Sequence, residues 1–296
     1  MGVIDLSAFA DEVGTDGPVT VSGLGTRGGA VVGVKCVHPP TGIEWMQPDE
    51  MIVCCGAGTP IDELVAALAA HGQTVALPLG GTVGGALAVG RSDHRRLGYG
   101  PVRDTLLQAR YVSAAGEVVK AGGPTVKNVS GFDLCRLLVG SRGTLGFLGE
   151  VIVRTRPLAQ HSQWFTCATA DPFDVFTRLY KPISVLWNGS AVFALLEGHS
   201  ADVAEQATSC AMTVCAGPPA LPTGSRRSVK PLDVSLDVSL DVLSQTGDFV
   251  AEVGVGIVHH ALPCAGEHVG EREIALTAAI KHQFDPAGRL NPGVHA

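Results

Sequence analysis

Three glycine-rich stretches are the part of this sequence best suited to hold an anionic ligand. They occupy residues 23–29, 80–85 and 140–146, and the first follows directly on a run, 19–22, whose residues favour a strand. Glycine permits left-handed backbone conformations and close approach, so successive N–H groups in such loops can converge on phosphate oxygens without a lysine. The sequence therefore predicts a phosphate-containing ligand held by backbone groups.

The first stretch also fits the G-x-G-x-x-G pattern of Rossmann dinucleotide-binding folds at residues 23–28. That pattern must open a helix and requires an acidic residue about 20 positions later. Residues 29–34 suit a strand better than a helix, and Glu44 is the sole acidic candidate but follows no strand. Several loops converging on one long ligand, such as FAD, explain the glycines better, with the Rossmann fold as the alternative.

The elements around these stretches follow from hydrophobic periodicity and turn chemistry. Residues 59–72 indicate a helix, with Thr59 as its cap, Pro60 in its first turn and Gly72 at its end. The remaining predicted elements of this half are strands at 51–55, 107–113, 117–120 and 150–154 and a helix at 129–138.

The following segment has the order β-α-β-β-α-β, which is typical of a ferredoxin-like fold. Its predicted elements are 164–168, 172–180, 183–187, 191–197, 201–212 and 249–258. A loop at 215–247 contains a repeat of Leu-Asp-Val-Ser over 232–242, which indicates a tandem duplication. A helix near 272–283 and a turn-rich tail complete the pattern.

Composition excludes several classes of protein. The net charge of −7 argues against a nucleic-acid partner. The eight cysteines include no CxxC pair, which argues against a zinc site or an iron–sulfur cluster and predicts no bound metal. Residues 64–90 lack charge but contain proline and six glycines, so they do not form a membrane span. With no basic and apolar leader at its start, the sequence predicts a cytoplasmic protein.

An ordered set of motifs gives the chain a family resemblance. The stretches are CGAGTPIDEL (55–64), GTVGG (81–85), GPVRD (100–104), GGPTVKNVSGFD (122–133), LVGSRGTLG (138–146) and FDPAGRLNPG (284–293). The chain resembles the FAD-binding subunits of bacterial glycolate oxidases, within the vanillyl-alcohol-oxidase-type, or PCMH-type, superfamily. The resemblance implies an α+β fold: a two-subdomain PCMH-type FAD-binding module at 1–157, an abbreviated ferredoxin-like cap at 158–262, and a C-terminal segment at 263–296 that returns to the first domain.

The resemblance also implies which residues contact FAD, with residues 23–27 around the pyrophosphate. The implied set is Gly23, Leu24, Gly25, Thr26, Arg27, Gly81, Thr82, Val83, Gly84, Gly85, Arg103, Asp104, Gly143, Thr144, Leu145, Gly146 and Asn291. Many members attach the flavin through a histidine after an Arg-x-Gly-Gly stretch, whereas Ala30 follows Arg27-Gly-Gly here. We therefore expect FAD to be bound non-covalently.

The chemistry implied is oxidation of a small 2-hydroxy acid, which requires a base for the hydroxyl proton and a cation for the carboxylate. His259 and His260 are the candidate bases, and on an alternating strand only one of them can point toward a given face. Arg142 and Lys127 are the candidate cations.

Because the sequence has no cysteine motif for an iron–sulfur cluster, its electrons must pass to a separate iron–sulfur subunit or to a soluble acceptor. The resemblance implies a hetero-oligomer with a second flavin subunit and an iron–sulfur subunit, through which the chain could lie at the inner face of the membrane. Two alternatives stay open: a flavin-bearing structural subunit without its own turnover, and a stand-alone FAD oxidase of an alcohol or sugar.

Overall fold

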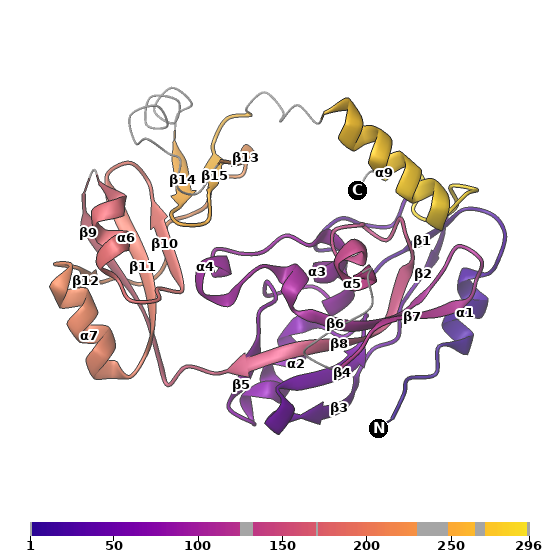
Figure 1. The fold of residues 1–296 in the computed structure, drawn as a ribbon, viewed down its shortest axis with the longest axis horizontal. Coiled ribbons are helices and arrows are strands. Elements are labelled where there is room, and N and C mark those ends of the chain that lie inside the picture. The colour runs from indigo at the N-terminus through magenta and orange to yellow at the C-terminus, as the bar shows by residue number, and fades with distance from the viewer. Residues whose placement is uncertain (1, 125–132, 170, 230–247, 264–269, 295–296) are drawn as a thin grey trace. The chain divides into compact units, whose positions relative to one another are not determined.

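The chain folds into two units, each with its own sheet and hydrophobic core (Figure 1). The computed structural model describes residues 2–124, 133–169, 171–229, 248–263 and 270–294. The first unit comprises residues 1–93, 101–158 and 269–296, and the second comprises 94–100 and 159–268. Residues 94–100 thus cluster with the second unit, although the sequence places them inside the continuous stretch 1–157.

The first unit is built on an antiparallel sheet in the order β3-β4-β8-β6-β7. Its strands are β3 (Ile43–Gln47), β4 (Ile52–Gly56), β8 (Phe147–Pro157), β6 (Leu106–Val112) and β7 (Val118–Gly122), and β5 (Gln73–Val75) pairs with the end of β8. A separate parallel pair is formed by β1 (Val19–Val21) and β2 (Lys35–Val37). The predicted hairpin at 107–120 is confirmed as β6 and β7.

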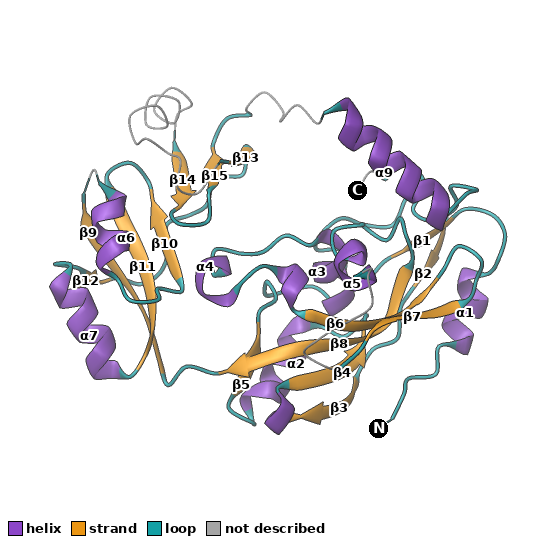
Figure 2. Ribbon diagram, viewed as in Figure 1, coloured by secondary structure: helices purple, strands orange, loops and turns teal. Residues whose placement is uncertain are grey.

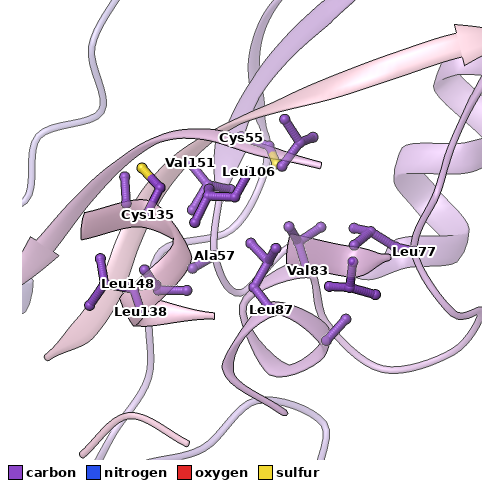
Figure 3. Packing of buried hydrophobic residues seen from close by; sticks show 14 of the residues in the cluster. Cys55, Ala57, Leu77, Val83, Leu87, Leu106, Cys135, Leu138, Leu148 and Val151 are labelled. Carbon is purple, nitrogen blue, oxygen red and sulfur yellow. The ribbon is translucent and has the colours of Figure 1, made fainter. Parts of the chain in front are cut away.

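Helices pack on this sheet through side chains spaced three or four residues apart. In α2 (Ile61–Ala69) the buried residues are Ile61, Leu64 and Leu68, which lie on one face of the helix. Side chains of α3 (Val83–Val89) and α5 (Leu134–Leu138) join them against β4, β6 and β8, as Figure 3 shows for Val83, Leu87 and Leu138. Figure 2 shows the remaining helices of this unit, α1 (Ser7–Val13) and α9 (Glu271–Phe284).

Two local predictions for this unit are wrong. Thr59 does not cap α2, because its hydroxyl donates to the carbonyl of Gly42 and accepts from the Gly42 N–H, so the N-cap position falls to Pro60. Residues 29–34 form a loop rather than a strand; Val32 is 98% exposed, and the Val31 N–H donates to the Thr20 hydroxyl instead of a sheet partner. Since no helix follows Gly28 either, the Rossmann alternative is excluded.

The second unit is a seven-stranded sheet with helices on one face. Its strands run in the order β12 (Thr213–Val214), β9 (His161–Ala168), β11 (Ala191–Gly198), β10 (Ser184–Trp187), β14 (Phe249–Glu252), β15 (Ile257–His260) and β13 (Ser225–Ser228). Apolar side chains of α6 (Pro172–Arg178) and α7 (Ser200–Ser209) pack with the sheet in one core. The short helix α4 (Arg96–Tyr99) belongs to this unit, and the Tyr99 hydroxyl donates to the Glu197 carboxylate at 3.0 Å.

The ferredoxin-like prediction needs one correction. The strand that completes β-α-β-β-α-β is β12, which follows α7 and pairs with β9. Residues 249–258 were expected to be that strand, but they form part of a hairpin, β14 and β15, that extends the opposite edge beside β10. The turn between β14 and β15 contains Gly254 and Gly256, both with φ near +80°, so a single straight strand cannot form there.

Within the described part of the chain, every helix is too short or too polar to span a bilayer. The repeat at 232–242, Lys127 and the first residues of the predicted helix 129–138 lie outside the described residues.

Candidate functional site

A cavity of about 300 Å³ in the first unit brings the three glycine-rich stretches together. Its floor and walls come from the loop that follows β1, from the start of α3, from the turn before β8 and from the C-terminal tail. Of the residues predicted to hold FAD, those that line it are Gly23, Leu24, Gly25, Thr26, Arg27, Thr82, Gly84, Gly85, Gly143, Gly146 and Asn291. Segments almost 270 residues apart in sequence therefore share one site.

The loop after β1, residues 22–29, presents unused backbone donors to this cavity. The N–H groups of Gly23, Leu24 and Gly25 donate no hydrogen bond to any residue that the structure describes. Gly25 has φ +69°, a left-handed conformation that a glycine adopts without the penalty of a side chain. Successive free N–H groups next to a left-handed residue are the arrangement that concentrates positive potential for an anion.

The start of α3 forms a second wall and approaches the turn after β4 very closely. The Gly84 N–H donates to the Ala57 carbonyl at 2.7 Å, and a Cβ on Gly84 would lie 2.8 Å from that oxygen. The Thr82 hydroxyl caps α3 by accepting from the Gly85 N–H at 3.1 Å. Because these N–H groups are already used within the chain, this wall contributes shape to the cavity rather than donors.

Asn291 ties the C-terminal tail to two walls of the cavity. Its Oδ1 accepts from the Thr20 hydroxyl at 2.8 Å and from the Val21 N–H at 3.2 Å. Its Nδ2 donates to the Arg142 carbonyl at 2.6 Å. The residue is 7% exposed, and its side chain joins the end of β1 to the turn at 142–143.

The tail that carries Asn291 is held by a charged cluster. Arg289 donates to the carbonyls of Val13, Gly14, Asp16, Gly17 and Ala114 at 2.7–3.1 Å. Asp285 accepts from Lys281 Nζ at 2.5 Å and from the N–H groups of Arg289 and Leu290. Burial opposes ionisation of Asp285, but these hydrogen bonds outweigh it and hold the pKa of the carboxyl below its ordinary value.

Arg27 lines the cavity, yet its guanidinium donates to the neighbouring loop, 78–82. Nη1 donates to the Gly80 carbonyl at 2.5 Å, and Nη2 donates to the carbonyls of Pro78 and Leu79 at 2.8 and 2.9 Å. Burial lowers the pKa of Arg27, and the carboxylates of Asp62 and Asp93 oppose that shift. The group remains charged at neutral pH.

The other predicted FAD contacts do not line the cavity. Val83 and Leu145 are buried in the core of the unit because their side chains are apolar, and Thr144 is buried with its hydroxyl donating to the Ser141 carbonyl. Gly81 lies next to the Arg27 guanidinium, so a Cβ on Gly81 would be 2.3 Å from Nη1. Arg103 and Asp104 lie in η2 (Val102–Asp104), where they pair with each other at 3.9 Å.

Sequence reasoning missed several lining residues that carry no distinctive chemistry. They include Ala57, Ala88, Val89, Leu138, Ser141 and Phe147. One signal was available for α3: residues 84, 85, 88 and 89 share a helix face, and three of the four are glycine or alanine. Small side chains along one helix face permit close approach of a ligand.

The two candidate histidines lie in the second unit and face opposite sides of its sheet. His260 is 1% exposed and shares a face with the core residues Phe249 and Val258; burial lowers its pKa, with the charges of Arg227 and His259 acting in the same direction. His259 lies on the other face, where Nε2 is 2.8 Å from Glu252 Oε1. The Glu252 side chain is 3% exposed, and its Oε2 has no partner among the described residues.

Comparison with known families matches both parts of this architecture. The FAD binding domain family matches residues 12–122, and the C-terminal domain family of FAD linked oxidases matches residues 225–294. Together the two matches cover more than half of the chain. The chain therefore contains an FAD binding domain followed by an FAD linked oxidase C-terminal domain. The predicted family and cofactor are thereby confirmed.

Individual curated relatives are similar to this chain over part of their length. Glycolate oxidase subunit GlcE of Escherichia coli (strain K12) is 38% identical over 134 residues, which are 44% of this chain and 37% of that protein. A D-lactate dehydrogenase of Archaeoglobus fulgidus is 35% identical over 156 residues, which are 50% of this chain and 35% of that protein. The matched part of the chain spans little more than a third of these relatives.

Solved structures confirm the predicted fold class. An alkyldihydroxyacetonephosphate synthase superposes with a TM-score of 0.63 over 97% of this chain and 73% of its own, at 15% sequence identity. At that identity the similarity concerns the fold: two sheet-containing subdomains of the PCMH type.

Proposed function

We propose that the cavity of the first unit holds FAD non-covalently, with its pyrophosphate at the N–H groups of Gly23, Leu24 and Gly25. The observation that carries the proposal is that these three consecutive donors line the cavity without a partner among the described residues. Consecutive exposed N–H groups that no described residue of the chain accepts from are free to donate to an anion such as a pyrophosphate. The residue after Arg27-Gly-Gly is Ala30, which has no nucleophile for a covalent flavin bond.

Bound FAD supplies the capacity to accept a hydride from a donor CH–OH group. The chain's own residues have three tasks in this proposal. The loop 22–29 holds the anion, and the wall at Gly84 and Ala57 fixes the shape of the cavity. Asn291 holds the C-terminal tail against the turn at 142–143.

The test is release of the cofactor on denaturation. The purified protein is expected to be yellow and to release intact FAD into the supernatant after acid or heat treatment. Flavin that stays with the denatured chain would show a covalent bond and reject the non-covalent assignment. A protein that purifies without flavin and binds none on titration would reject the site.

We further propose that the substrate is a small 2-hydroxy acid and that the chain acts as a subunit of a dehydrogenase. The support is the similarity to a glycolate oxidase subunit and to a D-lactate dehydrogenase. The matches to the FAD binding domain and to the C-terminal domain of FAD linked oxidases add to it. Anaerobic mixing with a panel of 2-hydroxy acids should bleach the flavin absorbance for at least one acid. Absence of bleaching with flavin fully bound would favour the structural-subunit alternative.

Of the two histidines, we propose His259 as the base for the substrate hydroxyl. Its Nε2 contacts a buried carboxylate, which can orient the ring and stabilise the imidazolium that forms when it takes a proton. His259→Gln should slow flavin reduction by about 10²-fold or more. His260→Gln is the matched control, because the adjacent ring lies on the core face; equal loss in both variants would contradict the assignment.

The proposed assembly contains a second flavin subunit and an iron–sulfur subunit, which receive the electrons and can hold the chain at the inner face of the membrane. The word "subunit" in the name of the Escherichia coli relative supports an assembly. Affinity purification from the native host, followed by mass spectrometry and iron analysis, tests it. A chain recovered alone, free of iron and with rapid oxygen-dependent turnover, would favour the stand-alone oxidase.

A further inference from the structure

Arg27 has three hydrogen-bond acceptors, and all three are carbonyls of consecutive residues in loop 78–82. The distances to the oxygens of Pro78, Leu79 and Gly80 are 2.8, 2.9 and 2.5 Å. A planar guanidinium presents its N–H groups in one fork, so it can serve several acceptors that lie close together. The Nη1 and Nη2 groups of Arg27 therefore donate to protein carbonyls in this structure.

Loop 78–82 has its own attachments to α2. The Gly81 carbonyl accepts from the Ile61 N–H at 2.9 Å, and the Gly80 N–H donates to Asp62 Oδ1 at 3.3 Å. Loop 22–29, by contrast, presents exposed backbone to the cavity. The guanidinium thus joins a loop anchored to a helix with the loop that carries the unpaired donors.

The contact between the two loops is close. A Cβ on Gly81 would lie 2.3 Å from Arg27 Nη1 and 2.3 Å from the Thr26 hydroxyl oxygen. Residues 26 and 27 therefore lie against position 81 with no room for a side chain there. This packing explains why Gly81 belongs to the motif although it does not line the cavity.

We infer that Arg27 is a positioning residue for FAD: it fixes loop 22–29 against loop 78–82, so that the N–H groups of residues 23–25 are held ready for the pyrophosphate. The inference rests on the proposed FAD site and deepens it. Arg27 was expected from the sequence to wrap the pyrophosphate itself; here its contribution passes through the neighbouring loop. A preorganised loop loses less conformational entropy when the ligand binds, and affinity rises accordingly.

Lysine cannot replace Arg27 in this role. Its ammonium group is a compact charge on a flexible stem and does not present a planar fork to three adjacent carbonyls. A residue acting on phosphate only through its charge, in contrast, would tolerate lysine. The conservative substitution therefore separates the two roles.

The experiment compares Arg27→Met and Arg27→Lys with the unchanged chain by two measurements. FAD is titrated into the apoprotein, and hydrogen exchange is followed by mass spectrometry on the apoprotein's peptide covering 78–82. We expect both variants to bind FAD at least about tenfold more weakly and to exchange faster in that peptide before any FAD is added.

Arg110→Gln is the matched control. Arg110 also donates to a backbone carbonyl, that of Ile4, and pairs with Glu150, but it does not line the cavity. This variant should lower thermal stability without changing FAD affinity or the exchange of peptide 78–82. It therefore reports the effect of losing an arginine contact in the same unit.

The outcomes are separable. FAD affinity within about twofold of the unchanged chain in Arg27→Met, or unchanged apoprotein exchange in peptide 78–82, would overturn the positioning role, since preorganisation requires both effects. Full affinity in Arg27→Lys would overturn it as well and would assign the residue to phosphate through its charge. Failure of the unchanged chain to bind FAD would instead reject the proposed function.

Discussion

Alanine at Gly84 and alanine at Gly25 should damage the protein in different ways. At Gly84 a Cβ would lie 2.8 Å from both the Cβ and the carbonyl oxygen of Ala57, whereas carbon atoms in contact prefer about 3.5–4.0 Å. Ala57 cannot move easily, because its N–H donates to the Gly149 carbonyl at 2.8 Å and its own carbonyl accepts a hydrogen bond from the Gly84 N–H. The new methyl group therefore overpacks a fixed site.

The magnitudes follow from two opposing effects at Gly84 and one effect at Gly25. Overpacking a core costs about 1–3 kcal/mol, and alanine in place of glycine inside a helix returns up to about 1 kcal/mol. With the backbone of Ala57 immobile, we expect Gly84→Ala to lower the free energy of unfolding by about 2 kcal/mol. At Gly25 the nearest atom is 3.9 Å away, so only the left-handed φ of +69° matters, and the cost is about 1 kcal/mol.

Urea unfolding of the apoproteins measures both losses without interference from the cofactor. Gly29→Ala is the control in the same loop, because its Cβ meets nothing within 4 Å and its φ is not left-handed. Its unfolding midpoint should equal or slightly exceed that of the unchanged chain, since alanine restricts the unfolded chain more than glycine does. A Gly84→Ala midpoint equal to the control would refute the close approach of α3 to the turn after β4. A Gly25→Ala loss larger than that of Gly84→Ala would refute the ranking.

Three further predictions concern the tail and the cysteines. Arg289→Met leaves five buried or partly buried carbonyls without their donor, so it should lower the free energy of unfolding, measured in urea, by about 3 kcal/mol or more. An unchanged free energy of unfolding would show that the tail is not needed for folding. The folded pKa of Asp285 lies below its unfolded value of about 3.8. Its contribution to the free energy of unfolding is therefore complete above that pH and is lost as the pH falls through the folded pKa. Asp285→Asn should flatten this part of the acid-unfolding profile, and an unchanged profile would contradict the prediction. Burial raises the pKa values of Cys54 and Cys55 to about 12, so in the native state at pH 8 a thiol reagent should spare both and label the exposed Cys36 first; rapid labelling of Cys54 or Cys55 in peptide mapping would contradict their burial.

The cavity-lining residues of the first unit could be predicted from the sequence more completely than the strands of the second unit. The loop 22–29, the start of α3 and the turn at 143–146 could be recognised because glycine at fixed spacing has a direct backbone meaning. Ala57 and Leu138 could not, because a small or apolar side chain is equally suited to a core and to a cavity wall. The three carbonyls that accept from Arg27 could not be predicted, because their position in another loop depends on the tertiary structure.

In the second unit, hydrophobic runs located β9, β10 and β11 but not their neighbours. β12 has only two residues, both exposed, so no run marks it. Residues 249–258 are apolar almost throughout, which conceals the turn, although Gly254 and Gly256 at a spacing of two were the available signal. Which of His259 and His260 faces the core depended on the register of β15, which a one-residue slip would reverse.

The chain passes from one unit to the other four times, at residues 93–94, 100–101, 158–159 and 268–269. The second unit therefore cannot be excised as one continuous fragment: residues 159–268 alone would lack Leu97, which packs against its core, and Tyr99, which bonds Glu197. A gene fusion or truncation that cuts at residue 158 would remove Leu97 from the edge of that core and the hydrogen bond of Tyr99 to Glu197. For protein engineering, a self-sufficient second unit has to include residues 94–100, grafted through a designed connection.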